Sequence, residues 1–355
     1  MFHSLSLVPL VLIFAAAAGA VWIAGMVLSN TTDVLGTRLG LGQALGGLIL
    51  LAFATNLPEA AITFTAARSH NLGIATGNIL GGIAIQTVVL AILDQWGLRN
   101  EPLTYRAASL TLVLEGALVC ALLVVVIMGT RLSPDVIYAR VTPPGLLILA
   151  FWIAGLYLVG RARRGLPWHE AGNPPDGQAM AGGTARQMKS EDRERRGHST
   201  ARVSAEFAVA AAVTLAAGVV LEESGSGIAD HIGLSGVLFG ATILAAATAL
   251  PEVSTGLASM RLGDYQLAVS DIFGGNAFLP VLFLVATVVS GEAVLPQARN
   301  TDVYLTALGA LLTVVYMCGM IFRPRRQWLR LGPDSMLVVL LYALGIVGLI
   351  KVTGG

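Results

Sequence analysis

Long apolar stretches recur along the whole chain and are separated by short polar ones. A helix needs about 20 apolar residues to cross the ~30 Å core of a bilayer. Ten stretches come close to or exceed this length, at about 6–28, 40–67, 72–97, 107–128, 143–160, 205–222, 234–260, 265–290, 302–321 and 335–352. Residues 161–204 are instead rich in Gly, Pro, Ser and charged residues, with too few apolar ones to form a core. The pattern predicts an all-α membrane protein with five spans on each side of a polar linker.

The two halves carry the same sequence motif. Ala-Thr-Asn-Leu-Pro-Glu at 54–59 returns 193 residues later as Ala-Thr-Ala-Leu-Pro-Glu at 247–252, and an ungapped alignment of 40–84 with 233–277 gives 17 identities in 45 positions. A long-period repeat of this kind indicates duplicated structural units. Because five spans is an odd number, the second copy enters the membrane upside down. Inverted repeats are a transporter architecture with the site at the midplane.

We therefore expect ten transmembrane helices as two inverted five-helix repeats. The first repeat covers residues 1–160, a cytoplasmic linker 161–204, and the second repeat 205–355. The linker is interpreted as solvated, with calcium sensing or lipid head-group binding by its basic residues as the alternative. The first span is not expected to be a signal peptide, because no basic residue precedes it and it is too long.

Charge strengthens the membrane prediction and adds an orientation. Only 12% of the residues are charged, about half the share in soluble domains. If the linker is cytoplasmic, the loops on that side hold 17 of the 22 Lys and Arg residues. Lys and Arg in short loops stay cytoplasmic. We expect an integral, multi-pass protein of the plasma or inner membrane with both termini outside. Both cysteines lie inside predicted spans, so they indicate no disulfide framework.

Three carboxyl groups and an amide are predicted to lie at mid-membrane. Glu59 precedes the turn at 69–71 by about ten residues and Asn78 follows it by about eight, which puts both ~12–15 Å below the surface. The repeat keeps this spacing in Glu252 and Asp271. A charged side chain at this depth costs a few kcal/mol, and no Lys or Arg falls in the middle of any predicted span. The four residues therefore predict a functional ionic site.

The two prolines of the motif add backbone ligands. Pro58 and Pro251 lack an N–H, so the helices are predicted to be discontinuous at the Pro-Glu motifs, with carbonyls free near Thr55 and Thr248. Together these groups supply roughly six to eight oxygen ligands, the number that calcium takes. Zinc and copper are disfavoured because no cysteine or histidine lies nearby. We expect no cofactor, with calcium, sodium or protons as transported ions.

At these residues the chain resembles the cation/calcium exchanger superfamily, whose best-known members are the sodium/calcium exchangers. Its members share ten spans, two inverted repeats and a motif of the Gly-Thr-Ser-x-Pro-Glu type in each repeat. The resemblance implies secondary antiport of calcium against sodium or protons by alternating access. It also implies a central calcium site, whose metal ligands in this chain are Glu59, Glu252, Asp271 and Asn78, with the repeat threonines Thr55 and Thr248 beside them.

The chain departs from the family at small hydroxyl residues. The serine after each repeat threonine is Asn56 in the first repeat and Ala249 in the second. In sodium-coupled relatives such serines help to hold sodium, so we expect protons to drive exchange at least as well as sodium. The accessory candidates for cation contacts are Asn56, Thr76, Ser270 and Glu115.

Glu115 lies mid-way along the predicted span 107–128 and has no acidic counterpart at position 308, which is Leu. One interpretation is a hydrogen bond between helices while the carboxyl is protonated. The other is a role in the passage of protons or counter-ions.

Other function classes stay open at this point. A calcium-independent antiporter of monovalent cations and protons fits the same carboxylates, and so does a sensor or scaffold that keeps the fold without transporting. An intramembrane enzyme is disfavoured, because all five histidines lie at helix ends or in loops and only one aspartate is predicted at the midplane. The expected partners are the transported cations and the lipid bilayer, with no nucleic acid. The oligomeric state is not indicated.

Overall fold

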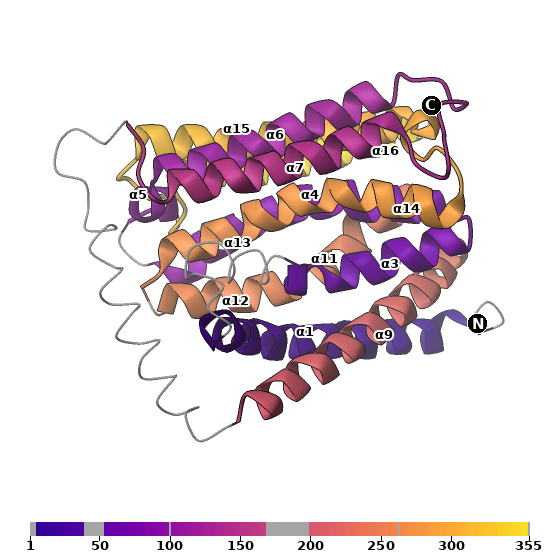
Figure 1. The fold of residues 1–355 in the computed structure, drawn as a ribbon, viewed down its shortest axis with the longest axis horizontal. Coiled ribbons are helices and arrows are strands. Elements are labelled where there is room, and N and C mark those ends of the chain that lie inside the picture. Colours follow the sequence, from indigo (N-terminus) through magenta and orange to yellow (C-terminus); the bar gives the residue numbers. More distant parts are fainter. Residues whose placement is uncertain (1–4, 39–52, 99–100, 168–198, 262, 354–355) are drawn as a thin grey trace.

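The computed structural model describes residues 5–38, 53–98, 101–167, 199–261 and 263–353. These ranges form a bundle of long helices running roughly side by side (Figure 1). The long helices of the first half are α1 (Leu7–Arg38), α3 (Leu57–Arg68), α4 (Leu72–Gly97), α6 (Leu110–Gly129) and α7 (Pro143–Ala162). Those of the second half are α9 (Thr200–Ile232), α12 (Leu250–Arg261), α13 (Tyr265–Phe278), α14 (Leu282–Ser290), α15 (Asn300–Phe322) and α16 (Pro333–Thr353).

Short elements connect the long helices. They are α5 (Leu103–Ala107), α10 (Gly236–Phe239), the π-helical turn η2 (Gly240–Leu244), α11 (Ala245–Thr248), and the 3₁₀ turns η3 (Leu279–Val281) and η4 (Leu295–Gln297). No β-sheet forms in the described ranges, where the extended pairings are the isolated bridges Tyr138–Val141 and Trp328–Leu331. The predicted all-α class is therefore confirmed for the described part of the chain.

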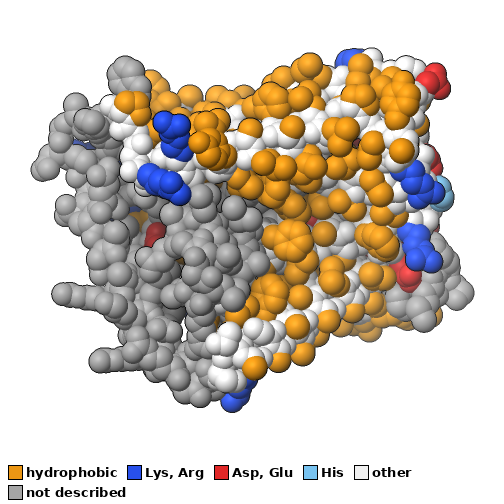
Figure 2. Space-filling view, viewed as in Figure 1, with side chains coloured by type: hydrophobic (Ala, Val, Ile, Leu, Met, Phe, Trp, Pro, Cys, Tyr) orange, Lys and Arg blue, Asp and Glu red, His pale blue; other side chains and the backbone are white. Residues whose placement is uncertain are grey.

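Nine helical stretches in the described residues are long and apolar enough to cross a membrane. Hydrophobic side chains cover the middle of the visible surface, and charged ones gather toward its ends (Figure 2). This is the surface of an integral, multi-pass membrane protein. The tenth expected span, 40–67, lies partly in residues 39–52, outside the described ranges. The arrangement as ten helices in two inverted repeats stays a prediction.

Helices α1 and α9 are longer than the spans predicted at 6–28 and 205–222. They contain 32 and 33 residues, and they pack against each other along one side of the bundle (Figure 1). Helix α1 continues past the predicted end at residue 28 and through Thr31. The Thr31 hydroxyl donates to the backbone oxygens of Val27 and Leu28, at 2.7 and 3.0 Å. Polar residues whose side chains bond back to the helix in this way do not end it.

Both Pro-Glu motifs coincide with an interruption of the helix. Residues 53–55 are helical, Asn56 interrupts, and α3 begins at Leu57. In the second half η2 and α11 precede the interruption at Ala249, and α12 begins at Leu250. Each proline thus lies in a first helical turn, where its missing N–H costs no helical hydrogen bond. Glu59 and Glu252 occupy the same first turns, where the helix dipole favours an anion.

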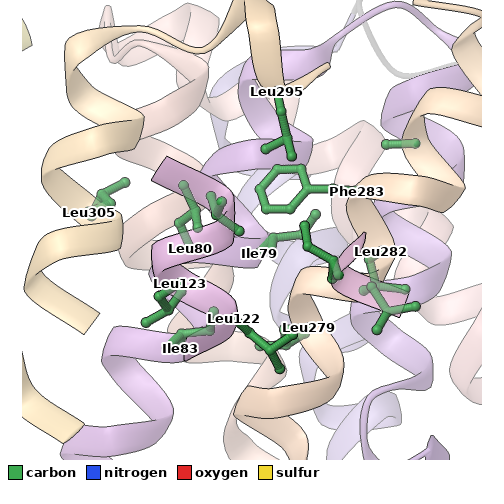
Figure 3. Packing of buried hydrophobic residues seen from close by; sticks show 14 of the residues in the cluster. Ile79, Leu80, Ile83, Leu122, Leu123, Leu279, Leu282, Phe283, Leu295 and Leu305 are labelled. Atoms are coloured by element: carbon green, nitrogen blue, oxygen red, sulfur yellow. The ribbon is translucent and has the colours of Figure 1, made fainter. Parts of the chain in front are cut away.

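Helix α4 lies at the centre of the bundle. Its residues Ile79, Leu80 and Ile83 pack with side chains of α6 and of the segment around η3 (Figure 3). The glycines of α4 allow its backbone to approach the second half closely. A Cβ on Gly77 would lie 2.6 Å from the backbone oxygen of Val237 in α10. Helix α4 is therefore fixed against both halves of the chain.

Candidate cation-binding site

Glu59 and Glu252 come together at a third side chain, Gln86 of α4. The Gln86 amide nitrogen lies 3.5 Å from Oε1 of Glu59 and 3.5 Å from Oε1 of Glu252. All three residues are buried, with exposed fractions of 0% for Glu59, 1% for Glu252 and 0% for Gln86. One amide thus joins a carboxyl group from each half of the chain inside the bundle. Hydrogen bonds to charged groups are among the stronger ones in proteins.

Two further predicted residues lie beside this pair. Thr248, one residue before the second helix interruption, lies near Glu59, and its hydroxyl donates a hydrogen bond of 3.2 Å to the Ala245 backbone oxygen. Asp271 of α13 lies close enough to Glu252 for the two carboxyl groups to interact electrostatically. One Asp271 oxygen accepts a hydrogen bond of 2.9 Å from the Thr255 hydroxyl. The structure therefore brings Glu59 and Glu252 together at Gln86, with Thr248 near Glu59 and Asp271 near Glu252.

The three acids and Gln86 each have a buried oxygen without a hydrogen-bond partner in the described part of the chain. They are Glu59 Oε2, Glu252 Oε2, Asp271 Oδ1 and Gln86 Oε1. A buried oxygen left unpaired costs free energy, and a charged one costs more. Carboxylate and amide oxygens are ligands that hard cations such as calcium prefer. The donor set therefore fits a hard cation.

The carboxyl groups do not already form a metal cage. Among the described residues, no three His, Cys, Asp or Glu side chains are grouped so that they could hold one metal ion. We therefore expect a bound cation to take part of its coordination from amide, hydroxyl or backbone oxygens.

Asn78 lies on α4 as predicted but has no hydrogen bond to the carboxyl pair. It is fully buried, and neither its Oδ1 nor its Nδ2 has a partner in the described residues. It precedes Gln86 by eight residues, or about 12 Å of helix. A Cβ on Gly240 would lie 3.0 Å from the Asn78 backbone nitrogen. A role for Asn78 in binding cations stays a prediction.

The residues around the first interruption lie close to Gln86. Thr55 and Asn56 are both buried, and the Asn56 amide nitrogen lies 3.5 Å from the Thr55 hydroxyl. A Cβ on Gly275 would lie 2.9 Å from that nitrogen and 3.3 Å from Gln86 Oε1. Glycine at 275 therefore leaves room for both amides, which places Asn56 beside the site.

Thr76 and Ser270, the other accessory candidates, bond elsewhere. The Thr76 hydroxyl donates to the Gly73 backbone oxygen at 3.3 Å and lies near Asp302 of α15. Ser270 precedes Asp271 in α13, but its hydroxyl donates to Glu115 Oε2 at 2.8 Å.

Glu115 has an ionic partner that the sequence did not predict. Helix α6 begins at Leu110, so Glu115 lies in its second turn rather than mid-span. Its Oε1 accepts a hydrogen bond of 2.7 Å from Nη2 of Arg163, which also lies 2.8 Å from the Ser270 hydroxyl. Arg163 caps α7 and belongs to the segment predicted as linker. A bond between helices is present, from Ser270 of α13, but Arg163 makes Glu115 part of an ion pair instead of the protonated carboxyl that was expected.

The repeat does not indicate Gln86 as a site residue. Its counterpart 193 positions later is Leu279, so it has no matched partner. Its signal is of another kind, a polar residue in a mostly apolar stretch. It lies about two helical turns from Asn78 and thus on the same helix face.

We expect Gln86→Leu to raise the calcium concentration for half-maximal transport about tenfold or more. The substitution leaves two carboxyl groups without their shared donor and removes one oxygen ligand, and hydrogen bonds to charged groups contribute about 1.5–3 kcal/mol. Initial rates of calcium uptake into proteoliposomes measure the effect, with Leu90→Met, one turn further along α4, as the control. An unchanged calcium dependence in Gln86→Leu would remove Gln86 from the site.

The sequence model of the family described as "Sodium/calcium exchanger protein" matches residues 9–161 and 204–351. CaxA of Alkalimonas amylolytica is 27% identical over 292 residues, which cover 81% of this chain and 84% of CaxA. The inner membrane protein YrbG of Escherichia coli (strain K12) is 27% identical over 286 residues, covering 79% of this chain and 80% of YrbG.

Two solved structures share the fold. The crystal structure of the H⁺/Ca²⁺ exchanger CAX matches with a TM-score of 0.65 at 12% identity, covering 97% of this chain and 87% of CAX. The sodium-calcium exchanger NCX_Mj, soaked without Na⁺ and Ca²⁺, matches with a TM-score of 0.57 at 16% identity. That match covers 97% of this chain and 100% of NCX_Mj.

Proposed function

Because the chain belongs to the sodium/calcium exchanger protein family, we propose that this antiporter exchanges calcium for protons or sodium by alternating access. The proposed site is the cluster of Glu59, Gln86, Glu252 and Asp271, with Thr248, Thr55 and Asn56 beside it. The single observation that carries the proposal is the meeting of Glu59 and Glu252 at Gln86 inside the bundle. Inverted-repeat transporters bind their ions where the two halves meet.

The same cluster explains why ions would be exchanged rather than leak. Three carboxyl groups buried without a positive partner are unfavourable inside a membrane. Binding of a divalent cation, of sodium ions or of protons reduces this charge. The loaded protein can then rearrange between its two orientations at low cost, whereas the empty, fully ionised site cannot. Exchange requires only this difference between loaded and empty states.

A pH gradient is expected to drive calcium uptake at least as fast as a sodium gradient of equal size. The reason is the pair Asn56 and Ala249 at positions where sodium-coupled relatives carry hydroxyl groups. The measurement is calcium flux in proteoliposomes, with a pH gradient imposed in sodium-free buffer and a sodium gradient imposed at constant pH. Calcium uptake that occurs only with the sodium gradient would contradict the expectation. Flux under neither gradient would contradict the proposed function.

Exchange of monovalent cations for protons is a second candidate. It is favoured by the absence, among the described residues, of a group of three acidic side chains placed to hold one metal ion, because a proton or a monovalent ion needs fewer ligands. Sodium or potassium flux driven by a pH gradient, unaffected by millimolar calcium, would select this candidate. Competition by calcium would select the first.

The proposed orientation follows the charge distribution. Both termini lie outside and residues 161–204 lie in the cytoplasm, with 17 of 22 Lys and Arg residues on the cytoplasmic side. Labelling of single cysteines placed in the loops of intact cells tests this orientation.

A further inference from the structure

The turn between α15 and α16 has a strained backbone. Trp328 and Leu331 exchange two backbone hydrogen bonds of 2.9 Å each. Between them, Leu329 and Arg330 have φ angles of 53° and 67°. This is a two-residue hairpin turn with both central residues in the left-handed region, which normally takes Gly, Asn or Asp. Neither residue is of these types, so both positions are strained.

The corresponding turn of the first half has the same geometry. Tyr138 and Val141, between α6 and α7, also exchange two backbone hydrogen bonds of 2.9 Å. Ala139 and Arg140 have φ angles of 49° and 65°. Each turn begins with an aromatic residue and has Arg at its third position. The same backbone strain therefore occurs in both halves of the chain.

The α15–α16 turn exposes large hydrophobic side chains. The exposed fractions are 84% for Leu329, 82% for Phe322 and 58% for Trp328. Exposed side chains of this size are unfavourable in water. They lie at the ends of two helices that are long and apolar enough to span the membrane, where the bilayer meets water. Trp is enriched at that depth.

The same turn is strongly basic. Residues 319–333 contain four arginines and no Asp or Glu. Arg323 and Arg325 lie 5.6 and 5.3 Å from the ring centre of Tyr105 in α5. Arg326 and Arg330 are exposed, and neither has a hydrogen bond or an ion pair with any residue that the structure describes.

We propose that the α15–α16 turn, residues 322–331, binds the phosphate of anionic phospholipids at the membrane surface. Arginine binds phosphate through two parallel hydrogen bonds, and Arg326 and Arg330 are available for this. Leu329 and Trp328 enter the boundary between head groups and acyl chains. The charge distribution predicts this face to be cytoplasmic, where anionic lipids attract basic segments.

The first-half turn provides a matched comparison. Nη1 of Arg140 donates a hydrogen bond of 3.2 Å to the Val288 backbone oxygen of α14. This arginine is therefore engaged within the protein, and a neighbouring exposed arginine, Arg131, lies on the same loop. The 138–141 turn is not expected to bind anionic lipid in the same way.

The test is a titration of the purified full chain in detergent with phosphatidylglycerol and, separately, with phosphatidylcholine, followed by native mass spectrometry. We expect Arg326→Gln/Arg330→Gln to weaken phosphatidylglycerol binding about 30-fold, because each arginine is expected to contribute about fivefold to the affinity. The control variant Arg131→Gln/Arg140→Gln is expected to bind phosphatidylglycerol like the unaltered protein. Phosphatidylcholine is expected to bind weakly and equally to all three.

Two further arms make the result decisive. Trp328→Ser/Leu329→Ser keeps all four arginines and is expected to weaken phosphatidylglycerol binding as well, because the lipid loses its apolar contacts. Glycerol phosphate, which lacks acyl chains, is expected not to compete. Equal losses in the two double-arginine variants, no loss in either, or full competition by glycerol phosphate would each overturn the proposal.

Discussion

Glu59→Gln and Glu252→Gln are each expected to abolish calcium flux in proteoliposomes. Each substitution removes one charge from the pair that meets at Gln86 while keeping the size of the side chain. A hard divalent cation depends on carboxylate charge for much of its affinity. Loss of calcium flux is therefore expected in both variants.

The matched control for these variants is Glu206→Gln. Glu206 forms an exposed i,i+4 ion pair with Arg202 at the start of α9, at 3.1 Å, and such surface pairs contribute little. This variant is expected to transport like the unaltered protein. The site assignment would fail if Glu59→Gln and Glu252→Gln both transported calcium at normal rates.

Removal of one partner of the Glu115–Arg163 pair is expected to destabilise the protein by about 3–5 kcal/mol. Glu115 is buried and Arg163 is partly buried, with side-chain exposed fractions of 6% and 22%. Either single variant, Glu115→Gln or Arg163→Gln, leaves a charge inside the bundle without its partner. The double variant removes both charges and is expected to recover most of the loss. Thermal unfolding of the four proteins in one detergent measures this coupling.

The outcome also decides between the two interpretations of Glu115. Strong coupling between the two substitutions, with flux retained in the folded double variant, identifies the pair as structural. An inactive Glu115→Gln that unfolds normally and still binds calcium would instead show that Glu115 serves the passage of protons or counter-ions. If the loss of stability in the double variant equals the sum of the losses in the two single variants, the ion pair does not act as a unit.

Much of the fold follows from apolar length and proline position. The span predicted at 72–97 coincides with α4, and those predicted at 143–160 and 302–321 lie within two residues of α7 and α15. These agree because an apolar run bounded by polar residues leaves little choice of helix ends. The end of α1 was missed because the helix continues through Thr31, whose hydroxyl bonds back to it. The 3₁₀ turn at Pro280, inside the span predicted at 265–290, was also missed.

The candidate site was only partly predictable for a related reason. Glu59, Glu252 and Asp271 could be found because duplication preserves their spacing and because acids are costly inside a membrane. Gln86 and Arg163 could not be found by that argument. Gln86 is uncharged and has no counterpart in the second half, and Arg163 reaches Glu115 from the end of α7. The contacts of residues without a counterpart in the other half depend on how the helices pack, which the sequence pattern does not predict.

The single amide at Gln86 has a consequence for the direction of transport. The two carboxyl groups that it joins come from equivalent places in the repeat, but the amide comes from the first half only, and Leu279 stands at the matching position. Opening toward one side of the membrane is therefore not the mirror image of opening toward the other. The cation is therefore expected to bind with different affinity from the two sides of the membrane. Transport is then expected to be faster in one direction than in the other under opposite gradients of equal size.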